Sequence, residues 1–168
     1  MIQTERLAFR KYTFEDLPFL LTMTSDPDVM KYIGDGRPWS ESETRERLTK
    51  FIGRYDTEGH SGLMLAIEKE SQRPIGHTGL VYRAVEGKQE LELGYWIARP
   101  HWGQGYAIEA ARGWKEYAFH ALGASRLVSI IQFGNEKSVK VAEKNGMAIE
   151  RSVVYNGKEV ALYSLEQG

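Results

Sequence analysis

Two glycines stand directly in front of a long helical pattern in this sequence. They belong to a six-residue stretch that comprises Trp102, Gly103, Gln104, Gly105, Tyr106 and Ala107. A helix N-terminus leaves about four N–H groups without intrahelical partners, and together with the helix dipole these groups attract anions, phosphate above all. Glycines at this place let the backbone approach a bulky diphosphate. The stretch is therefore a candidate phosphate-binding loop, with a tight strand-to-helix turn that holds no ligand as the alternative.

The spacing of this loop excludes two common nucleotide-binding motifs. A P-loop needs Gly-Lys-Ser/Thr at the start of the helix, whereas Gly105 is followed by Tyr106 and Ala107. A dinucleotide fingerprint needs a small residue three positions after the second glycine, and Ile108 occupies that position. The loop therefore predicts a phosphate-bearing ligand of another kind.

A carboxylate that can act as a general base lies in the strand predicted just before the loop. Alternation along Glu90–Ala98 places Glu92, Gly94 and Trp96 on one face of that strand. A mid-strand carboxylate that is partly desolvated beside a cleft can take a proton, directly or through water. Glu92 is thus a candidate base, and the structural alternative is solvent exposure or an ion pair with a nearby Arg or Lys.

Histidines offer little further chemistry. His77, on the preceding predicted strand, is a second candidate base, although a packed or exposed histidine is the commoner state. The sequence contains four scattered histidines and no cysteine, so neither metal-ligand spacing nor a thiolate site is present. We expect no metal.

Eleven predicted elements must position these residues, in the order β-α-α-β-β-β-α-β-α-β-β. The strands are expected at Thr4–Tyr12, Gly62–Glu70, Ile75–Arg83, Glu90–Ala98, Arg126–Phe133, Met147–Tyr155 and Glu159–Glu166. Capping boxes at Thr13/Asp16 and Ser40/Glu43 open the first two helices, an alanine-rich stripe from Ala107 to Leu122 marks the third, and Asn135–Lys144 is the fourth. Loops are expected at Pro27 and Gly34–Pro38, and turns at Gln72–Pro74 and Val85–Gln89.

This order predicts a single α/β (α+β) domain over residues 1–168. Three consecutive strands favour antiparallel pairing, whereas the strand–helix–strand crossing from Glu90 to Phe133 favours a local parallel pair. The result is one mixed, mostly antiparallel sheet of about seven strands flanked by four helices.

Composition narrows the class of partner. The net charge is −1 and the pI is about 6.4, so there is no general basic field for nucleic acid or membrane surfaces. No apolar run approaches the roughly 20 residues that span a bilayer, and the N-terminus is too charged for a signal peptide. The absence of cysteine fits a reducing compartment, and we expect a cytoplasmic protein.

Two motifs together resemble a known enzyme family. The segments LELGYWIARPHWGQGYAIEA and NEKSVKVAEKNGM resemble the GNAT superfamily of acyl-CoA-dependent N-acetyltransferases, and more closely its branch that acetylates ribosomal-protein N-termini. The opening TERLAFR and the element order match as well, so the resemblance covers nearly the whole chain. It implies the GNAT fold, in which the fourth and fifth strands splay apart, and acetyl-CoA as donor.

The resemblance also implies how the donor binds. The family's diphosphate loop, Gln/Arg-x-x-Gly-x-Gly/Ala, begins here with Trp102, which is the usual residue in the ribosomal-protein branch and leaves phosphate binding to backbone amides. The pantetheine arm would bond the strand backbone at Trp96, Ile97 and Ala98. Lys137, Lys140 and Lys144 could meet the nucleotide phosphates or form an ordinary solvated helix face.

The remaining roles come from the same resemblance. It favours Glu92 as the base and matches Asn135 and Ser138 to a pantetheine contact and to a group near the CoA sulfur, so that Ser138 donates a proton to the thiolate or only hydrogen-bonds it. The tyrosine that many GNAT enzymes use as acid is replaced by Ala142. Asn135 is also expected to cap its helix.

The acceptor is expected to be a primary amine, either a peptide N-terminus or a small molecule. Tyr32 and Trp39 are candidate walls of its site, and Asp35 could attract a cationic amine, with loop anchoring as the structural alternative. A non-catalytic acyl-CoA sensor is the competing function, and the retention of Glu92, Asn135 and Ser138 together favours the enzyme. A homodimer is expected from the resemblance alone.

Overall fold

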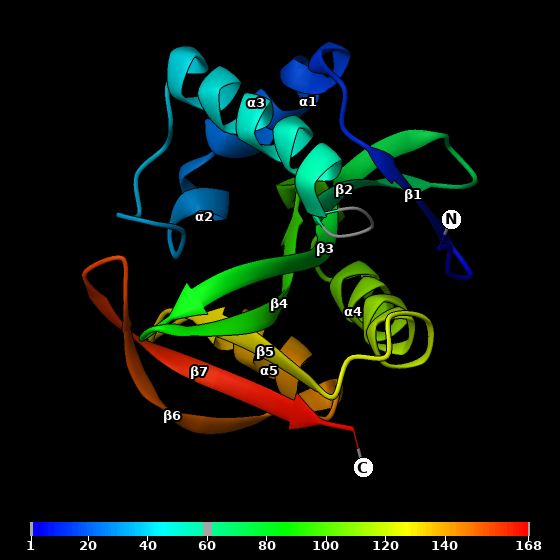
Figure 1. Ribbon diagram of the computed structural model, residues 1–168. Helices are drawn as coiled ribbons and strands as arrows, with labels where there is room; N and C mark the ends of the chain where they lie inside the picture. The colour runs from blue at the N-terminus through cyan, green and yellow to red at the C-terminus, as the bar shows by residue number, and fades with distance from the viewer. Residues whose placement is uncertain (1, 59–61, 168) are drawn as a thin grey trace.

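A single seven-stranded sheet organises the computed structural model, which describes residues 2–58 and 62–167 (Figure 1). Its strands are β1 (Leu7–Lys11), β2 (Gly62–Glu68), β3 (Arg73–Val85), β4 (Lys88–Ile97), β5 (Arg126–Ile131), β6 (Ala148–Tyr155) and β7 (Lys158–Glu166). Their order across the sheet is β1-β2-β3-β4-β5-β7-β6. The β4–β5 pair is parallel and the other pairs are antiparallel, which confirms the predicted mixed sheet.

The described α-helices number five, whereas four helices were expected. They are α1 (Leu17–Thr24), α2 (Pro27–Met30), α3 (Glu41–Glu58), α4 (Tyr106–Glu116) and α5 (Glu136–Lys144). The loop predicted at Pro27 is wrong because the Asp26 side chain caps the N–H of Asp28 and proline suits the first helical position. In Figure 1, α1 and α3 lie above β1–β3, and α4 lies below these strands, where it contacts α5.

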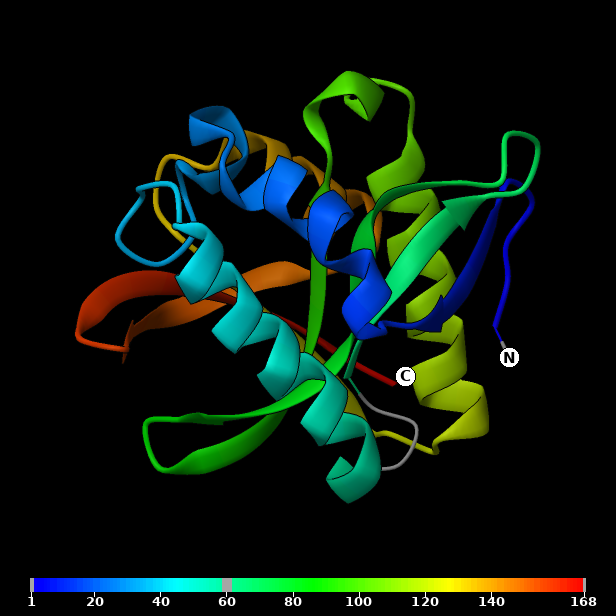
Figure 2. The ribbon, with the colours of Figure 1, turned by 90° about the horizontal axis from the view of Figure 1, so that it is seen from above.

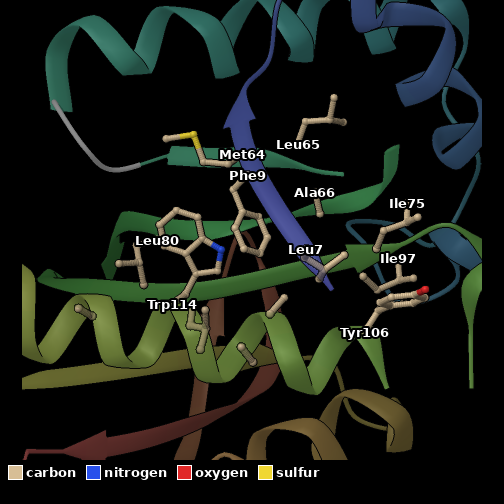
Figure 3. Packing of buried hydrophobic residues seen from close by; sticks show 14 of the residues in the cluster. Leu7, Phe9, Met64, Leu65, Ala66, Ile75, Leu80, Ile97, Tyr106 and Trp114 are labelled. Carbon is tan, nitrogen blue, oxygen red and sulfur yellow. The ribbon is translucent and has the colours of Figure 1, made fainter. Parts of the chain in front are cut away.

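Helix α4 is the anchor of the molecule's main core. Ala110, Ala111 and Trp114 are buried on its inner face, as the alanine stripe predicts. Trp114 packs edge-on against Phe9 of β1 at 5.3 Å between ring centroids, and its Nε1–H donates to Thr78 Oγ1 of β3 over 2.7 Å. Figure 3 shows this indole directed up against the strands. The helix that carries the glycine loop is thereby fixed to the sheet.

Strand β5 separates two apolar clusters. Its Leu127 belongs to the main core, whereas Val128 packs with Val85, Val153, Val160 and Leu162 on the other face. This arrangement confirms that the apolar run is a strand buried on both faces.

Strand ends differ from the sequence prediction in a way that matters for the site. β1 begins at Leu7 rather than Thr4, and β3 begins at Arg73, inside the predicted turn. The β3–β4 connection is only two residues long, Glu86 and Gly87, both with positive φ, as a tight hairpin requires. The register that follows pairs Arg83 with Glu90 and Val81 with Glu92.

The parallel strands β4 and β5 separate almost as soon as they meet. Within the described ranges they pair at one position, Glu92 with Val128, and the Ser129 hydroxyl then donates to the carbonyl of Leu93 over 2.9 Å. Beyond this point β4 continues to Ile97 while β5 ends at Ile131. The two strands are thus splayed, as expected.

Candidate active site

The glycine loop has a backbone that only glycine adopts without strain. Gly103 and Gly105 have φ values of 75° and 80°, in the left-handed region. A Cβ added to Gly103 would meet nothing within 4 Å, so the space beside this residue is open to a ligand. The turn therefore needs glycine, and the backbone beside Gly103 is open.

The loop leads directly into α4. The N–H of Glu109 donates to the carbonyl of Gly105 over 3.1 Å, which begins the intrahelical ladder. The N–H groups of Tyr106, Ala107 and Ile108 precede that first bond and have no intrahelical acceptor. Partial positive charge collects at this end of a helix, and this backbone chemistry fits a diphosphate.

An arginine from the N-terminal segment holds the loop in place. The Arg6 guanidinium donates to the carbonyl of Gln104 over 2.9 Å and pairs with Glu109 over 2.7 Å. It also lies 4.1 Å from the centroid of the Tyr106 ring. Sequence reasoning did not find Arg6, because nothing in the local pattern links residues almost a hundred positions apart.

Trp102 ties the loop to the end of β4. Its indole N–H donates to the carbonyl of Ile97 over 2.7 Å, and the Lys137 ammonium of α5 lies 3.9 Å from the centre of the ring. Trp102 therefore acts through its side chain on the strand rather than as a phosphate donor. Lys137 is placed beside the loop by this cation–π contact.

Backbone alternation decides which groups of β4 face the gap. The N–H of Ala98 donates to the carbonyl of Ile75 in β3, and the carbonyl of Ala98 accepts from the N–H of His101. Both backbone groups of Ala98 are therefore already hydrogen-bonded, and its N–H points to β3. In an antiparallel ladder the N–H and C=O of one residue point to the same neighbour. Trp96 therefore also points to β3, whereas Tyr95 and Ile97 point to the β5 side. Of the three residues predicted to bind pantetheine, only Ile97 has its backbone toward the gap, and Tyr95 joins it.

Ser138 and Asn135 lie at the start of α5, across the gap from β4. The Asn135 side chain accepts from the N–H of Ser138 at 3.3 Å, which confirms the cap. The Tyr95 hydroxyl donates to the carbonyl of Ser138 over 2.9 Å, and burial raises the pKa of Tyr95, so this phenol stays a neutral donor. Tyr95 bridges the gap and fixes the turn that carries Ser138.

Glu92 has an arginine partner. Arg83 of β3 donates from Nε to Glu92 Oε1 over 3.0 Å, and 14% of the Glu92 side chain remains exposed. The neighbouring acid on the same face, Glu90, is bound more tightly because Arg126 donates to both of its oxygens over 3.1 and 2.9 Å. The ion pair considered as the alternative for Glu92 is therefore present.

His77 is packed in the core and is not open to a substrate. Burial lowers the pKa of His77 to about 3, and its Nδ1 lies 2.7 Å from the hydroxyl of Tyr12. The centroid of its ring lies 4.5 Å from that of the Trp96 ring, and the ring packs edge-on against Phe51 of α3. His77 supports the wall of the site rather than serving as a second base.

The residues predicted for the acceptor site are held by different neighbours. Trp39 packs edge-on against Trp96 at 5.8 Å, so it borders the face that carries Glu92. Tyr32 lies against the loop before α5, where a Cβ on Gly134 would come within 3.3 Å of its ring. Asp35 pairs with Arg37 over 3.0 Å, so its charge is already met by a cation within its own loop.

Sequence reasoning missed a basic recess between α3 and the strands. A cavity of about 50 Å³ is lined by Arg47, Lys50, Phe51, Arg54, Leu63, Val81 and Arg83. The basic residues of α3 recur at helical spacing, and this pattern could have indicated one charged face. Arg83 could not be placed beside them, because that requires the strand register, which is not predictable from a single sequence. We call this cavity the basic recess.

The described residues form neither a metal-binding cluster nor a membrane-spanning helix. Within residues 2–58 and 62–167, no group of three or more His, Cys, Asp or Glu side chains is arranged to hold a metal ion. In the same part of the chain, every helix is too short or too polar to cross a bilayer.

Comparison with known proteins gives a consistent result. Residues 6–148 match the family model described as "Acetyltransferase (GNAT) domain". The chain is 32% identical to uncharacterized protein YkkB of Bacillus subtilis, over 95% of this chain and 92% of that protein. It is 31% identical to uncharacterized N-acetyltransferase p20 of Bacillus licheniformis, over 83% and 78%. A solved GNAT-family acetyltransferase from Bacillus anthracis superimposes with a TM-score of 0.80 at 29% identity, covering 98% and 97%.

Proposed function

Because this chain belongs to the GNAT acetyltransferase family, we propose that its glycine loop and the gap between β4 and β5 bind acetyl-CoA, its acetyl donor. The chain is an acyl-CoA-dependent N-acetyltransferase, and its acceptor is an amine. Family membership favours this enzyme over the non-catalytic sensor. The single observation that supports the location of the site is the parting of β4 and β5 after one paired position, along the strand that precedes the glycine loop.

We assign donor binding to the glycine loop, the end of β4 and the start of α5. The N–H groups from Gln104 to Ala107 hold the diphosphate, and Lys137 adds a positive charge above Trp102. The backbone of Tyr95 and Ile97 bonds the pantetheine arm, in place of the Trp96 and Ala98 of the sequence prediction. Asn135 lines the other side of the gap. This arrangement presents the thioester between Glu92 and Ser138.

The chemistry is a direct transfer within a ternary complex. Glu92 takes a proton from the acceptor ammonium, directly or through water, since only the free amine attacks. The amine nitrogen forms a bond to the thioester carbonyl carbon, the carbon–sulfur bond breaks, and the sulfur leaves with its electron pair. The nitrogen loses its second proton to solvent as the amide forms. Ser138 donates a proton or a hydrogen bond to that sulfur. N-acetylated amine and coenzyme A are the products, and holding the reactants together supplies several kcal/mol of the rate enhancement.

The acceptor enters between α3 and the β3–β4 strand pair. Trp39 and Tyr32 are proposed as its walls because one packs on Trp96 and the other on the loop before α5. The proposed acceptor is either a peptide N-terminus or a small amine. We also propose a homodimer, from the resemblance to the ribosomal-protein branch.

Substitution Glu92→Gln tests the assignment of the base. We expect kcat to fall by about 10²- to 10³-fold, as for loss of a general base, with the KM for acetyl-CoA little changed. Glu143→Gln, on an exposed position of α5, is the control and should retain full rate. A Glu92→Gln enzyme with wild-type kcat at all pH values would overturn the assignment.

Substitution Ser138→Ala separates the two roles of the serine. Loss of proton donation lowers kcat and changes its pH dependence, because the leaving thiolate must then take its proton from water. If kcat is unchanged across the pH range, Ser138 does not donate a proton. A thiol-release assay with acetyl-CoA and a panel of amines gives both rates.

A further inference from the structure

We propose that the acceptor is a primary amine that also carries a carboxylate, and that this carboxylate binds in the basic recess. The inference deepens the proposed function and rests on it, because it assumes that the acceptor enters between α3 and the strand pair. Free amino acids and peptides with an acidic residue near the N-terminus share this chemistry.

The recess collects positive charge from two elements. On α3, Arg47, Lys50 and Arg54 recur at positions i, i+3 and i+7, which places them on one stripe of the helix. That stripe faces Leu63 of β2 and Arg83 of β3 across the recess, and Figure 2 shows α3 crossing above the β3–β4 hairpin. Neighbouring like charges on a helix destabilise it slightly, and an anion beside Arg47 and Lys50 lowers that repulsion.

The size of the recess suits one functional group. Its volume of about 50 Å³ accommodates a carboxylate but not a whole amino acid or peptide. The rest of the acceptor therefore lies outside it, along the face of β4. Phe51, Leu63 and Val81 give the recess apolar walls, and partial desolvation strengthens the attraction between a guanidinium and a carboxylate.

The candidate base lies next to the recess. Arg83 lines it and also pairs with Glu92 over 3.0 Å. Gly94 shares the face of Glu92, and a Cβ there would lie 4.0 Å from Glu92 Oε1 and 3.6 Å from the Leu63 side chain. The recess and Glu92 are therefore parts of one surface, in which a negative group stands beside a cluster of positive ones. An ammonium at Glu92 and a carboxylate in the recess match this pattern.

The same charges disfavour a polycationic acceptor. None of the described residues that line the recess is acidic. Asp35, the acid predicted to attract a cation, is paired with Arg37 at its own loop. A polyamine would place further ammonium groups near the α3 stripe, where like charges repel.

Matched acceptor pairs test the inference on the whole enzyme. Thiol release from acetyl-CoA is measured with glycine against glycinamide, with an Ala-Asp peptide against the Ala-Asn peptide, and with spermidine. Rates are compared per free-amine form. We expect kcat/KM to be about tenfold higher for the acidic member of at least one pair, to fall as ionic strength rises, and to be lowest for spermidine.

The outcomes distinguish carboxylate binding in the basic recess from the acetyltransferase activity itself. The glycine pair and the peptide pair distinguish a free amino acid from an acidic peptide as the source of the carboxylate. Equal rates for acidic and neutral members, or faster acetylation of spermidine, would overturn this inference and leave the acetyltransferase proposal standing. No release with any amine would contradict the proposed site itself.

A charge substitution in the recess provides the second test. Lys50→Gln should reduce the preference for the acidic acceptor, measured as the ratio of kcat/KM within a pair, by about threefold. Arg45→Gln removes a charge from an exposed position of the same helix that does not line the recess, and it should keep the ratio. A ratio that is unchanged by Lys50→Gln, or equally changed by both substitutions, would contradict binding in the recess.

Discussion

The two halves of the proposed site present different kinds of group. The proposed donor half consists of the glycine loop, the N-terminus of α4, the end of β4 and the start of α5, and it presents mainly backbone groups. The proposed acceptor half consists of α3, the Gly34–Trp39 loop and the β3–β4 hairpin, and it presents charged and aromatic side chains. A backbone site binds what the whole family shares, whereas a side-chain site can change with the acceptor.

The two halves should therefore fail in different ways. Backbone groups are insensitive to protonation and depend on dihedral angles and on the contacts that hold their helices. Side-chain groups depend on charge and on burial. A change of pH, a glycine substitution and the removal of one hydroxyl separate these causes. Each would contradict the difference between the halves if it impaired the half for which it is not expected.

Lowering the pH should destabilise the protein through His77, which supports the wall of the acceptor half. Burial lowers its pKa to about 3, while histidine in an unfolded chain titrates near 6.5. The unfolded chain therefore binds a proton that the native protein does not, and stability falls as the pH drops below about 6.5. Between about pH 8 and pH 5 we expect a loss of about 2 kcal/mol in the free energy of unfolding, measured by urea denaturation.

Matched variants identify the group responsible. His77→Gln should remove most of this pH dependence because the amide does not titrate. His120→Gln, at a side chain that is 70% exposed, should leave it intact. If both variants behave alike, His77 is not the source.

A backbone substitution should act on the donor half. Gly103 and Gly157 have nearly the same φ, 75° and 76°, and a Cβ on either meets nothing within 4 Å. Gly103→Ala and Gly157→Ala should therefore each cost about 1–2 kcal/mol of stability. Only Gly103→Ala should also raise the KM for acetyl-CoA by about tenfold, equivalent to about 1.4 kcal/mol. An equal KM in both variants would reduce the loop to a simple turn.

A single hydroxyl should give the smallest effect. Tyr95→Phe removes the bond across the gap to the carbonyl of Ser138 and should cost about 1 kcal/mol of stability, with a rise of a few-fold in the KM for acetyl-CoA. Tyr82→Phe, at a residue 40% exposed on β3, is the control and should change neither value. A wild-type KM for Tyr95→Phe would show that the gap is fixed by other contacts.

The elements proposed to bind the donor were largely predictable from the sequence because their signals are local. Two glycines before a helical stripe, a cap at Asn135 and a continuous apolar strand each follow from neighbouring residues. The direction of the β4 backbone groups was not predictable, since it depends on which strand pairs with which. That is why Trp96 and Ala98 were expected at the gap where Tyr95 and Ile97 lie.

The acceptor half was less predictable because its contacts join distant segments. Alternation placed Glu92 on one face with Gly94 and Trp96, but its partner Arg83 depends on the two-residue turn at Glu86 and Gly87. The Asp35–Arg37 pair is different, because it joins residues two positions apart in one loop and the sequence analysis overlooked it. Pairing between charges on distant segments, such as Arg83 and Glu92, depends on strand register, which a single sequence does not encode locally.

The position of β7 has a consequence for the time order of synthesis. β7, the last strand along the described chain, lies between β5 and β6. The ribosome therefore delivers both neighbours before the strand that joins them, and β5 and β6 wait with unpaired edges. Because domains form as their chain emerges, the first four strands can assemble early, whereas the second half of the sheet closes only when residues up to Glu166 have been made. A nascent chain stalled shortly before this point would hold a complete glycine loop beside an unfinished sheet.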